Sequence, residues 1–534
     1  MKYSNLPAHA TLAQLCLSAS DKFKDGIAFS MITEGEINRQ ITYSQMGSLA
    51  KQVSSTLRNI GVKKGDRVLL LSDNCPEWPI AYFGISVAGA VSVPLLTGFS
   101  PEQVQHIIEH SGVRAICISR DMAQKLEGIN LSHIPFIYLE DIKEDKTISK
   151  EITETQAPDD LATIIYTSGT QGNSKGVMLS SKNIISSSVS SLTYVQTTPK
   201  DRLLSVLPLA HSYECSLGFL ASVLGGSNVT YLDKPPSPSV LLPALKLIRP
   251  TVMISVPLLI EKVYNNGIAP KLRKNPLYKF PLTRPLAVLV AGRKLIAALG
   301  GKIRFYGIGG APLSPHVEKF LYNARFPYAM GYGLTEAAPL VAGMQKFRPS
   351  LKTGITTPDG VTMRIENDEI QVTGPNVMLG YYNDAERTAE VMTSDGWLRT
   401  GDIGQINKKG ELHIKGRLKA LILGPSGENI YPEEIENLLG SSQLVEESLV
   451  YSGKRGELIA LVRLSEAAKA AAGILEHTSE AAKAAAGVIE HTLEDLRTWV
   501  NKKLAAFSRI SKIEIMHEPF EKTPTMKIKR YLYV

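Results

Sequence analysis

Cysteine is scarce in this chain of 534 residues. The four cysteines, Cys16, Cys75, Cys117 and Cys215, form no C-x-x-C pair. This spacing argues against a disulfide framework and against a structural zinc site. It predicts a reducing, cytoplasmic environment.

Long apolar runs are also missing. No stretch reaches the ~20 uninterrupted apolar residues that a membrane-spanning helix needs, and MKYSNLPAHATLAQLC at the start lacks the charged and apolar regions of a secretory signal. We therefore expect a protein that is neither exported nor membrane-spanning. Hydrophobic residues make up 44% of the chain and charged residues 21%, which excludes a disordered or fibrous protein.

Acidic residues are absent between Glu261 and Glu318, although the chain as a whole has a net charge of +8. The window holds the basic residues Lys262, Lys271, Arg273, Lys274, Lys279, Arg284, Arg293, Lys294, Lys302 and Arg304. Interleaved with Leu, Tyr and Phe, they fit three alternatives: a peripheral contact with an anionic membrane through 262–304, a solvated basic loop, or a site for the phosphates of coenzyme A. No motif supports nucleic acid as a partner.

The order of sequence patterns predicts a multi-domain α/β fold. Helical and strand-like runs alternate over the first ~160 residues and continue to about residue 310, which is typical of layered α/β subdomains. From about Thr353 the pattern changes to alternating strands around Asn-Asp and Lys-Lys-Gly turns, which indicates a β-rich subdomain. A strand, a Gly-rich turn and a helix opened by Pro432 follow. We predict an N-terminal domain over 1–416 with two α/β subdomains and the β-rich one, and a small mobile α+β lid over 417–534.

An internal repeat interrupts the predicted lid. SEAAKAAAGILEHT at 465–478 is followed by SEAAKAAAGVIEHT at 479–492, and twelve of the fourteen positions are identical. Alanine and the Glu-x-x-Lys spacing favour a helix. The repeat is either a duplication that lengthens a surface helix or a helix that binds a partner, and the first alternative is the simpler one.

The segment YTSGTQGNSKGVMLS (166–180) has the composition of a phosphate-binding loop. It follows the apolar strand LATIIY and supplies backbone N–H groups, hydroxyls and one lysine. It is not a Walker A loop, because Ser174 stands where the second glycine is required and Gly176 follows Lys175. A dinucleotide fingerprint beginning at Gly307 fails likewise, because Pro312 replaces its third glycine.

Six further motifs follow this loop in a fixed order. They are LPLAHSYE (207–214), GIGGAPLS (307–314), GYGLTEAAP (331–339), WLRTGD (397–402), GRLKALILGPSGENIYPEEIE (416–436) and TPTMKIKR (523–530). Together with the loop they resemble the motifs of the adenylate-forming superfamily, which includes acyl-CoA synthetases, luciferases and the adenylation domains of peptide synthetases. The resemblance covers nearly the whole chain. TPTMKIKR is most similar to the variant found in long-chain fatty acid-CoA ligases.

The resemblance implies a role for each matching residue. It assigns nucleotide and coenzyme A binding to Thr167, Ser168, Gly169, Thr170, Lys175, Gly309, Gly310, Ala311, Tyr332, Gly333, Thr335, Asp402, Arg417 and Gly427. Glu336 would bind Mg²⁺, which prefers oxygen ligands. Lys527 would contact the carboxylate and the α-phosphate, His211 would position the acyl group or the thiol beside Tyr213 and Glu214, and Lys419 would be the hinge of the lid.

The reaction implied by the resemblance is the ATP-dependent activation of a carboxylic acid to an acyl-adenylate, followed by transfer to a thiol. ATP, Mg²⁺ and coenzyme A are the expected cofactor and substrates. A medium- or long-chain fatty acid is favoured by TPTMKIKR and by the apolar SLGFLASVLGG after His211. An acyl carrier protein as acceptor and an aryl acid as substrate remain alternatives, and a non-catalytic sensor is disfavoured because the motif residues are all present.

Overall fold

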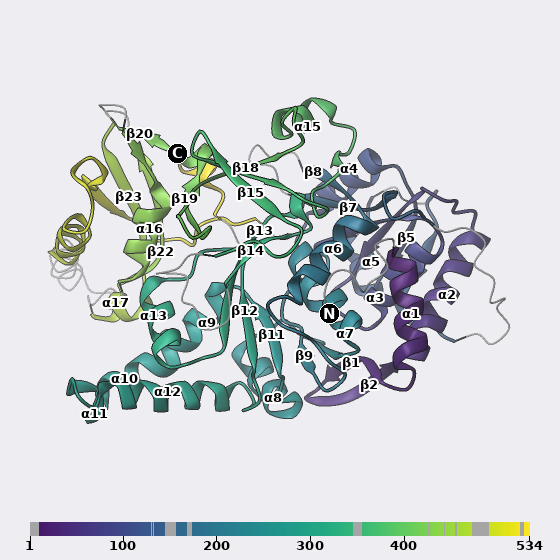
Figure 1. Ribbon diagram of the computed structural model, residues 1–534, viewed down its shortest axis with the longest axis horizontal. Helices are drawn as coiled ribbons and strands as arrows, with labels where there is room; N and C mark the ends of the chain where they lie inside the picture. Colours follow the sequence, from purple (N-terminus) through teal and green to yellow (C-terminus); the bar gives the residue numbers. More distant parts are fainter. Residues whose placement is uncertain are drawn as a thin grey trace. The chain divides into compact units, whose positions relative to one another are not determined.

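The fold is described by a computed structural model of the chain (Figure 1). The described residues are 10–129, 131, 133–144, 156–167, 174–344, 355–424, 428–442, 444–453, 456–471, 491–523 and 528–534. Five predicted site residues therefore lie outside them: Ser168, Gly169, Thr170, Gly427 and Lys527. Most of the predicted repeat helix, 472–490, also lies outside them.

Contacts divide the chain into two compact units. The first comprises Met1–Ala311, Phe320–Met363 and Val372–Leu398, and the second comprises Pro312–Lys319, Arg364–Gln371 and Arg399–Val534. The predicted multi-domain α/β fold is confirmed by the sheets and helices of these units. The boundary between body and lid at residue 416 and the hinge of the lid at Lys419 stay predictions.

A seven-stranded sheet forms one half of the first unit. Its strand order is β17-β8-β7-β4-β3-β5-β6. The bounds are β3 Arg67–Leu71, β4 Val91–Leu95, β5 Val113–Ile118, β6 Phe136–Tyr138, β7 Leu161–Thr167, β8 Lys175–Ser180 and β17 Gly380–Tyr381. Strands β3 to β7 are parallel, and β8 and β17 are antiparallel additions. This arrangement agrees with the predicted alternation of strands and helices.

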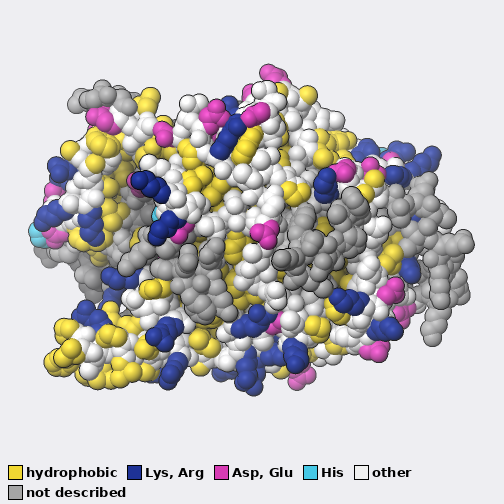
Figure 2. Space-filling view, viewed as in Figure 1, with side chains coloured by type: hydrophobic (Ala, Val, Ile, Leu, Met, Phe, Trp, Pro, Cys, Tyr) yellow, Lys and Arg dark blue, Asp and Glu magenta, His cyan; other side chains and the backbone are white. Residues whose placement is uncertain are grey.

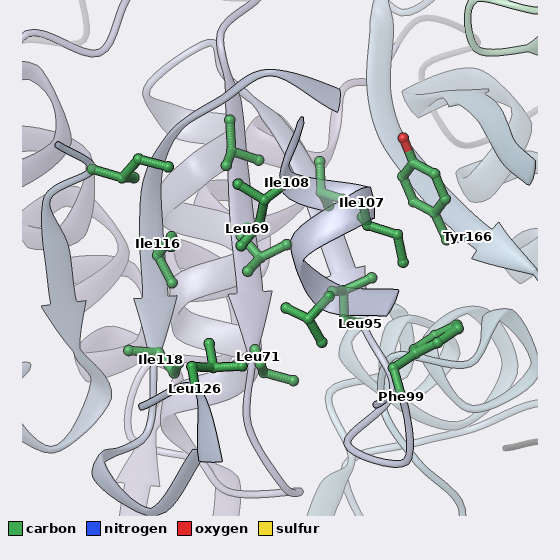
Figure 3. Packing of buried hydrophobic residues seen from close by; sticks show 14 of the residues in the cluster. Leu69, Leu71, Leu95, Phe99, Ile107, Ile108, Ile116, Ile118, Leu126 and Tyr166 are labelled. Carbon is green, nitrogen blue, oxygen red and sulfur yellow. The ribbon is translucent and has the colours of Figure 1, made fainter. Parts of the chain in front are cut away.

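Helices cover the seven-stranded sheet because their apolar faces need a partner. The helices of this region are α1 Leu12–Phe23, α2 Tyr43–Asn59, α3 Glu77–Val87, α4 Pro101–Ser111, α5 Arg120–Lys125 and α6 Ser181–Ser191. Ile107 and Ile108 of α4 pack with Leu69 and Leu95 of the strands (Figure 3). Each such buried side chain contributes roughly 1.5–3 kcal/mol to folding, so the core fixes α4 on the sheet.

An eight-stranded sheet forms the other half of the first unit. Its order is β14-β13-β12-β11-β9-β10-β1-β2, with antiparallel pairing only at its two edges. The strands are β1 Ile27–Thr33, β2 Glu36–Thr42, β9 Arg202–Leu204, β10 Asn228–Leu232, β11 Val252–Ser255, β12 Phe305–Ile308, β13 Tyr328–Gly333 and β14 Leu340–Gly343. Its helices are α7 Ala221–Gly225, α8 Pro238–Ile248, α9 Pro257–Lys262, α10 Ala269–Lys274, α11 Pro276–Lys279, α12 Arg284–Ala298 and α13 Pro315–Asn323.

The predicted β-rich region is a four-stranded sheet. It consists of β15 Thr362–Glu366, β16 Glu369–Thr373, β18 Leu398–Ile406 and β19 Leu412–Arg417, and α15 Ala385–Val391 precedes β18. Asn367 and Asp368 both have positive φ, 50° and 65°, in the turn between β15 and β16. Gly410 has a φ of 77° in the turn before β19. Both hairpins predicted from their turn residues are therefore confirmed.

The rest of the second unit combines short strands and helices. Its elements are β20 Ile422–Leu423, β21 Asn429–Ile430, α16 Pro432–Gly440, β22 Val445–Ser452, β23 Leu458–Leu464, α17 Glu466–Ala471, a helix over 491–501 and β24 Lys512–Ile515. The core contains Ile435 and Leu439 of α16, Ala460 and Val462 of β23, and Val500. Pro432 opens α16 as predicted, with two glutamates in its first turn.

No helix within the described ranges is long and apolar enough to cross a membrane.

Candidate active site

The phosphate-binding loop predicted from the sequence is framed by a β-hairpin. Strand β7 enters the loop at Thr167, and β8 leaves it at Lys175, which is the cross-strand partner of Thr167. The hydroxyl of Tyr166 lies 2.7 Å from Nδ1 of His110 on α4, so the helix anchors the strand just before the loop. The hairpin therefore places Thr167 and Lys175 together at the mouth of the loop.

Lys175 forms a compact cluster with two residues that are distant in sequence. Its Nζ donates to Glu336 Oε1 at 2.6 Å and to the Tyr381 hydroxyl at 2.5 Å. The Tyr381 hydroxyl donates to the same glutamate oxygen at 2.8 Å. Strand β17 carries Tyr381 and pairs with β8, which explains how this tyrosine reaches Lys175. The structure thus brings together two predicted site residues and a third, Tyr381, that sequence reasoning missed.

The charges of this cluster are stabilised by one another. Burial tends to raise the pKa of Glu336, but the charge of Lys175 and hydrogen bonds from Lys175, the backbone and Tyr381 outweigh it and hold the pKa below its ordinary value. Burial, together with the adjacent charge of Glu336, raises the pKa of Tyr381 far above its ordinary value. At neutral pH Glu336 is therefore a carboxylate and Tyr381 is a protonated phenol.

Thr167 supplies a further donor beside this cluster. Its Oγ1 is buried and has no hydrogen-bond partner among the residues that the structure describes. A buried hydroxyl without a partner costs folding free energy unless a ligand satisfies it. An anionic oxygen at the loop mouth would accept from Thr167 and would also face the Lys175 ammonium.

The segment GYGLTE places its residues at the end of β13 and in a short 3-10 helix, Thr335–Ala337. Gly333 allows the chain to turn back on itself, because a Cβ there would lie 2.1 Å from the carbonyl oxygen of Pro339. Thr335 Oγ1 lies 3.4 Å from the Ser212 hydroxyl. The GYGLTE and LPLAHSYE motifs therefore meet at Thr335 and Ser212, next to His211.

His211 lies in a turn whose backbone orients its ring. The backbone N–H of Tyr213 donates to His211 Nδ1 at 3.1 Å. Because Nδ1 accepts this hydrogen bond, the proton of the neutral ring is on Nε2. Tyr213 itself packs against the GIGG segment, where a Cβ on Gly309 would lie 3.2 Å from its ring. Gly310 has a φ of 86°, whereas Ala311, the third predicted residue of this motif, is exposed.

A polar network that sequence reasoning missed fixes the backbone before His211. Asn74 donates to the Leu207 carbonyl at 2.6 Å and to the Ser205 hydroxyl at 3.2 Å, and it accepts from the Leu209 N–H at 2.8 Å. The Ser205 hydroxyl in turn donates to Glu214 Oε1 at 2.6 Å. The network therefore connects the loop after β3 to both sides of His211.

Glu214 is the buried end of this network. Its exposure is 1%, and a Cβ on Gly218 would come within 2.7 Å of its carboxyl group. Burial raises the pKa of Glu214 to about 8 and outweighs the Ser205 hydrogen bond, which lowers it. The side chain is therefore largely protonated at neutral pH, and it begins a π-helical segment, Glu214–Leu220.

We expect Glu214→Gln to change how stability depends on pH. A folded-state pKa of about 8, above the unfolded value, means that protonation of Glu214 stabilises the fold fully below about pH 4.3 and that this contribution is lost as pH rises through 8. Glutamine keeps the acceptor for Ser205 and does not ionise. Relative to the wild type, the variant should gain about 4 kcal/mol of unfolding free energy between pH 5 and pH 9.

Urea unfolding at several pH values measures this difference directly. Glu127→Gln, on the surface, is the matched control, since Glu127 is exposed. The change in unfolding free energy that it causes is subtracted from that of Glu214→Gln at each pH. A remaining difference that does not vary with pH would show that the buried carboxyl does not titrate as described.

The second unit contains two of the residues predicted to bind the nucleotide, Asp402 and Arg417. Asp402 on β18 and Arg417 on β19 are cross-strand partners, and Arg417 Nε donates to Asp402 Oδ1 at 2.7 Å. Asp402 is buried, whereas Arg417 is exposed, and the Arg417 N–H donates to Glu433 at 2.9 Å. Lys419 lies two residues beyond, exposed in a short 3-10 helix, Leu418–Ala420.

Comparisons with known proteins agree with these motifs. The family model described as AMP-binding enzyme matches residues 18–382. Long chain acyl-CoA synthetase 6, a peroxisomal protein of Arabidopsis thaliana, is 30% identical over 92% of this chain and 79% of its own length.

Two solved structures share the fold. The anthranilate CoA ligase AuaEII, in complex with anthranoyl-AMP, has a TM-score of 0.79 at 19% identity, covering 100% of this chain and 98% of that one. The o-succinylbenzoate coenzyme A synthetase of Bacillus subtilis, in complex with ATP and a magnesium ion, has a TM-score of 0.74 at 23% identity, covering 98% and 99%. With the family model covering more than half of its length, the chain belongs to the AMP-binding enzymes of the adenylate-forming superfamily.

Proposed function

We propose that this chain is an AMP-forming acid-thiol ligase. A carboxylate would attack the α-phosphorus of ATP, releasing pyrophosphate and forming an acyl-adenylate. The thiol of coenzyme A would then attack the acyl carbonyl, releasing AMP and forming an acyl-CoA. The observation that carries this proposal is the Lys175, Glu336 and Tyr381 cluster at the mouth of the Thr/Ser/Gly-rich loop.

The cluster fits the polyphosphate of ATP. The Lys175 ammonium and the Thr167 hydroxyl, which has no partner among the described residues, are donors for phosphate oxygens, and we propose that Ser168, Gly169 and Thr170 complete the loop around them. Tyr332 would stack on adenine, Thr335 would contact the α-phosphate, and Asp402 would accept hydrogen bonds from the ribose hydroxyls. Arg417, which is hydrogen-bonded to Asp402, would contact the ribose or a phosphate.

A magnesium ion fits this site if Glu336 and the phosphates of ATP are its ligands. No group of three or more His, Cys, Asp or Glu residues that could hold a metal ion occurs in the described part of the chain. Mg²⁺ is commonly held by one or two carboxylates together with substrate phosphates, so Glu336 and the bound phosphates would suffice. When bound, the ion supplies positive charge that stabilises the phosphate oxygens.

The remaining predicted residues would serve the acyl group, the thiol and the change between the two steps. His211, with its ring fixed through Nδ1, would position the acyl group or the thiol. Lys527 would stabilise charge at the α-phosphate during adenylation. We further propose that the lid, 417–534, turns about Lys419 and that Gly427 then lies along the pantetheine chain. The residues that would border the nucleotide are Gly309, Gly310, Ala311 and Gly333.

We favour a medium- or long-chain fatty acid as the substrate. This proposal is supported by the Arabidopsis relative named a long chain acyl-CoA synthetase and by the TPTMKIKR motif. An aryl acid is the second candidate, because AuaEII, which shares the fold, is an anthranilate CoA ligase. Transfer to an acyl carrier protein instead of coenzyme A is the remaining alternative for the acceptor.

The test is acid-dependent release of pyrophosphate from ATP in the presence of Mg²⁺. A panel of fatty acids of increasing length and of aryl acids is compared, with and without coenzyme A, and the product is identified by mass. We expect fatty acyl-CoA and AMP. An acyl-adenylate that persists in the presence of coenzyme A would favour a carrier protein as acceptor, aryl-CoA would favour the second candidate, and no turnover with any acid would contradict the proposed function.

A further inference from the structure

A strip of the first unit exposes large apolar side chains to solvent. We define the apolar tip as α11, the turn 280–283 and the outward face of α12. Its most exposed side chains are Leu277 at 45%, Phe280 at 66%, Leu282 at 96%, Leu286 at 57% and Val290 at 40%. A soluble surface carries single exposed apolar residues without consequence, whereas a contiguous group of them marks an interaction site.

The outward face of α12 carries exposed apolar side chains, Leu286 and Val290, in addition to the buried apolar residues of its inner face. Ala287, Val288, Ala291 and Leu295 are buried on the inner face. A Cβ on Gly292 would lie 2.4 Å from the carbonyl oxygen of Ala324, so the helix is packed closely against the body of the unit. The exposed leucine and valine are therefore not required for packing α12 within the unit.

Hydrogen bonds hold the turn so that its apolar residues point outward. The Thr283 hydroxyl donates to the Leu277 carbonyl at 2.6 Å, and the Arg284 backbone N–H donates to the Phe280 carbonyl at 2.9 Å. Arg284 Nε donates to the Tyr278 carbonyl at 3.0 Å. Because the backbone is fixed in this way, Phe280 and Leu282 are presented at little further cost in conformational entropy.

Basic residues surround the apolar tip, and acidic residues are absent from this part of the sequence. The exposed basic side chains are Lys271, Arg273, Lys274, Lys279, Arg284, Arg293 and Lys294. Arg304, at the end of the acid-free window, pairs with Asp201, but across the described ranges no salt bridge involves any of these seven. Figure 2 shows hydrophobic and basic side chains mixed in the region where Figure 1 places α10 to α12.

We propose that the apolar tip docks on an anionic lipid bilayer. The exposed apolar side chains would enter the boundary between headgroups and acyl chains, while the lysines and arginines would pair with lipid phosphates and carboxylates. A symmetric dimer through the same face would instead bring seven uncompensated cations against seven others, which is unfavourable. The inference concerns a surface outside the candidate active site and does not depend on the proposed function.

Co-flotation of the full-length chain with vesicles tests the proposal. Vesicles of phosphatidylcholine alone are compared with vesicles containing one-third phosphatidylserine, at low and high salt. We expect binding to the anionic vesicles that weakens with salt. The triple variant Lys274→Gln, Lys279→Gln, Lys294→Gln should weaken binding about five-fold per lysine, the factor that about 1 kcal/mol represents. Phe280→Ser with Leu282→Ser should weaken it at least about ten-fold.

Matched variants elsewhere on the surface control for net charge and apolar exposure. Lys63→Gln, Lys200→Gln and Lys408→Gln remove the same charge from exposed positions outside the tip, and Ile37→Ser with Ile60→Ser removes two apolar side chains that are 41% and 40% exposed. Both sets should bind vesicles nearly as the wild type does. Vesicle binding that does not depend on lipid charge and is unchanged in the tip variants would overturn the proposal. The proposal would also be overturned if the chain did not bind vesicles and instead formed a dimer, detected by sedimentation, that the double variant Phe280→Ser with Leu282→Ser disrupts.

Discussion

Glu336→Gln is expected to lower acid-dependent pyrophosphate release by about a hundred- to a thousand-fold. The carboxylate is held in its charged form by Lys175 and Tyr381, although burial opposes ionisation. Glutamine keeps the size of the side chain but removes the negative charge that compensates the ammonium and that would share Mg²⁺ with the phosphates. The initial rate of pyrophosphate release, measured over a range of Mg²⁺ concentrations, checks the prediction, and the Mg²⁺ needed for half-maximal rate should rise.

Glu77→Gln provides a matched control for a broken ion pair. Glu77 is 8% exposed in its side chain and lies 2.6 Å from Arg39, a geometry close to that of Glu336 and Lys175, whose distance is also 2.6 Å. Loss of the Arg39 pair should affect stability and leave the requirement for Mg²⁺ unchanged. Equal loss of activity in the two variants would mean that Glu336 supports the fold and not the chemistry.

The sequence was sufficient for the local structure, because local structure depends on residues that are close together in the chain. The turn at Asn367 and Asp368 was predicted from two residues that tolerate positive φ, and both adopt it. The order of strands in the sheets could not be derived in the same way. Strand β1 pairs with β10, about 200 residues later, because packing of side chains across the whole unit decides that neighbour.

The same distinction applies to the candidate site. Lys175 and Glu336 were predicted because each belongs to a motif with polar and glycine residues at fixed spacing. Tyr381 was missed because it belongs to a short strand, Gly380–Tyr381, whose sequence has no such pattern, and only pairing with β8 brings it to Lys175. Glu214 was noticed beside His211, but its burial and its link through Ser205 to Asn74 depend on segments more than a hundred residues apart.

Lys527→Ala is expected to separate the two half-reactions. Removing one positively charged group that acts on the transition state costs about a hundred- to a thousand-fold in rate, so formation of the acyl-adenylate from acid and ATP should fall by that factor. Transfer from supplied acyl-adenylate to coenzyme A should remain within about three-fold of the wild type, because the proposed turn of the lid about Lys419 would take Lys527 away from the phosphate before the thiol attacks. Measuring both half-reactions on the same preparation gives the ratio of the loss in adenylation to the loss in thioester formation.

Lys529→Ala is the matched control in the same basic segment. The Lys529 ammonium pairs with Glu521 at 3.3 Å and belongs to the described part of the second unit. If the C-terminal lysines acted only as an exposed basic tail, the two alanine variants would lose the same amount of activity, and both half-reactions would change together. The adenylation role assigns the effect to one ammonium in one step. We therefore expect Lys527→Ala to lose adenylation alone and Lys529→Ala to remain close to the wild type. This result would distinguish a lysine that acts at the reacting phosphate from a basic tail that contributes only its charge.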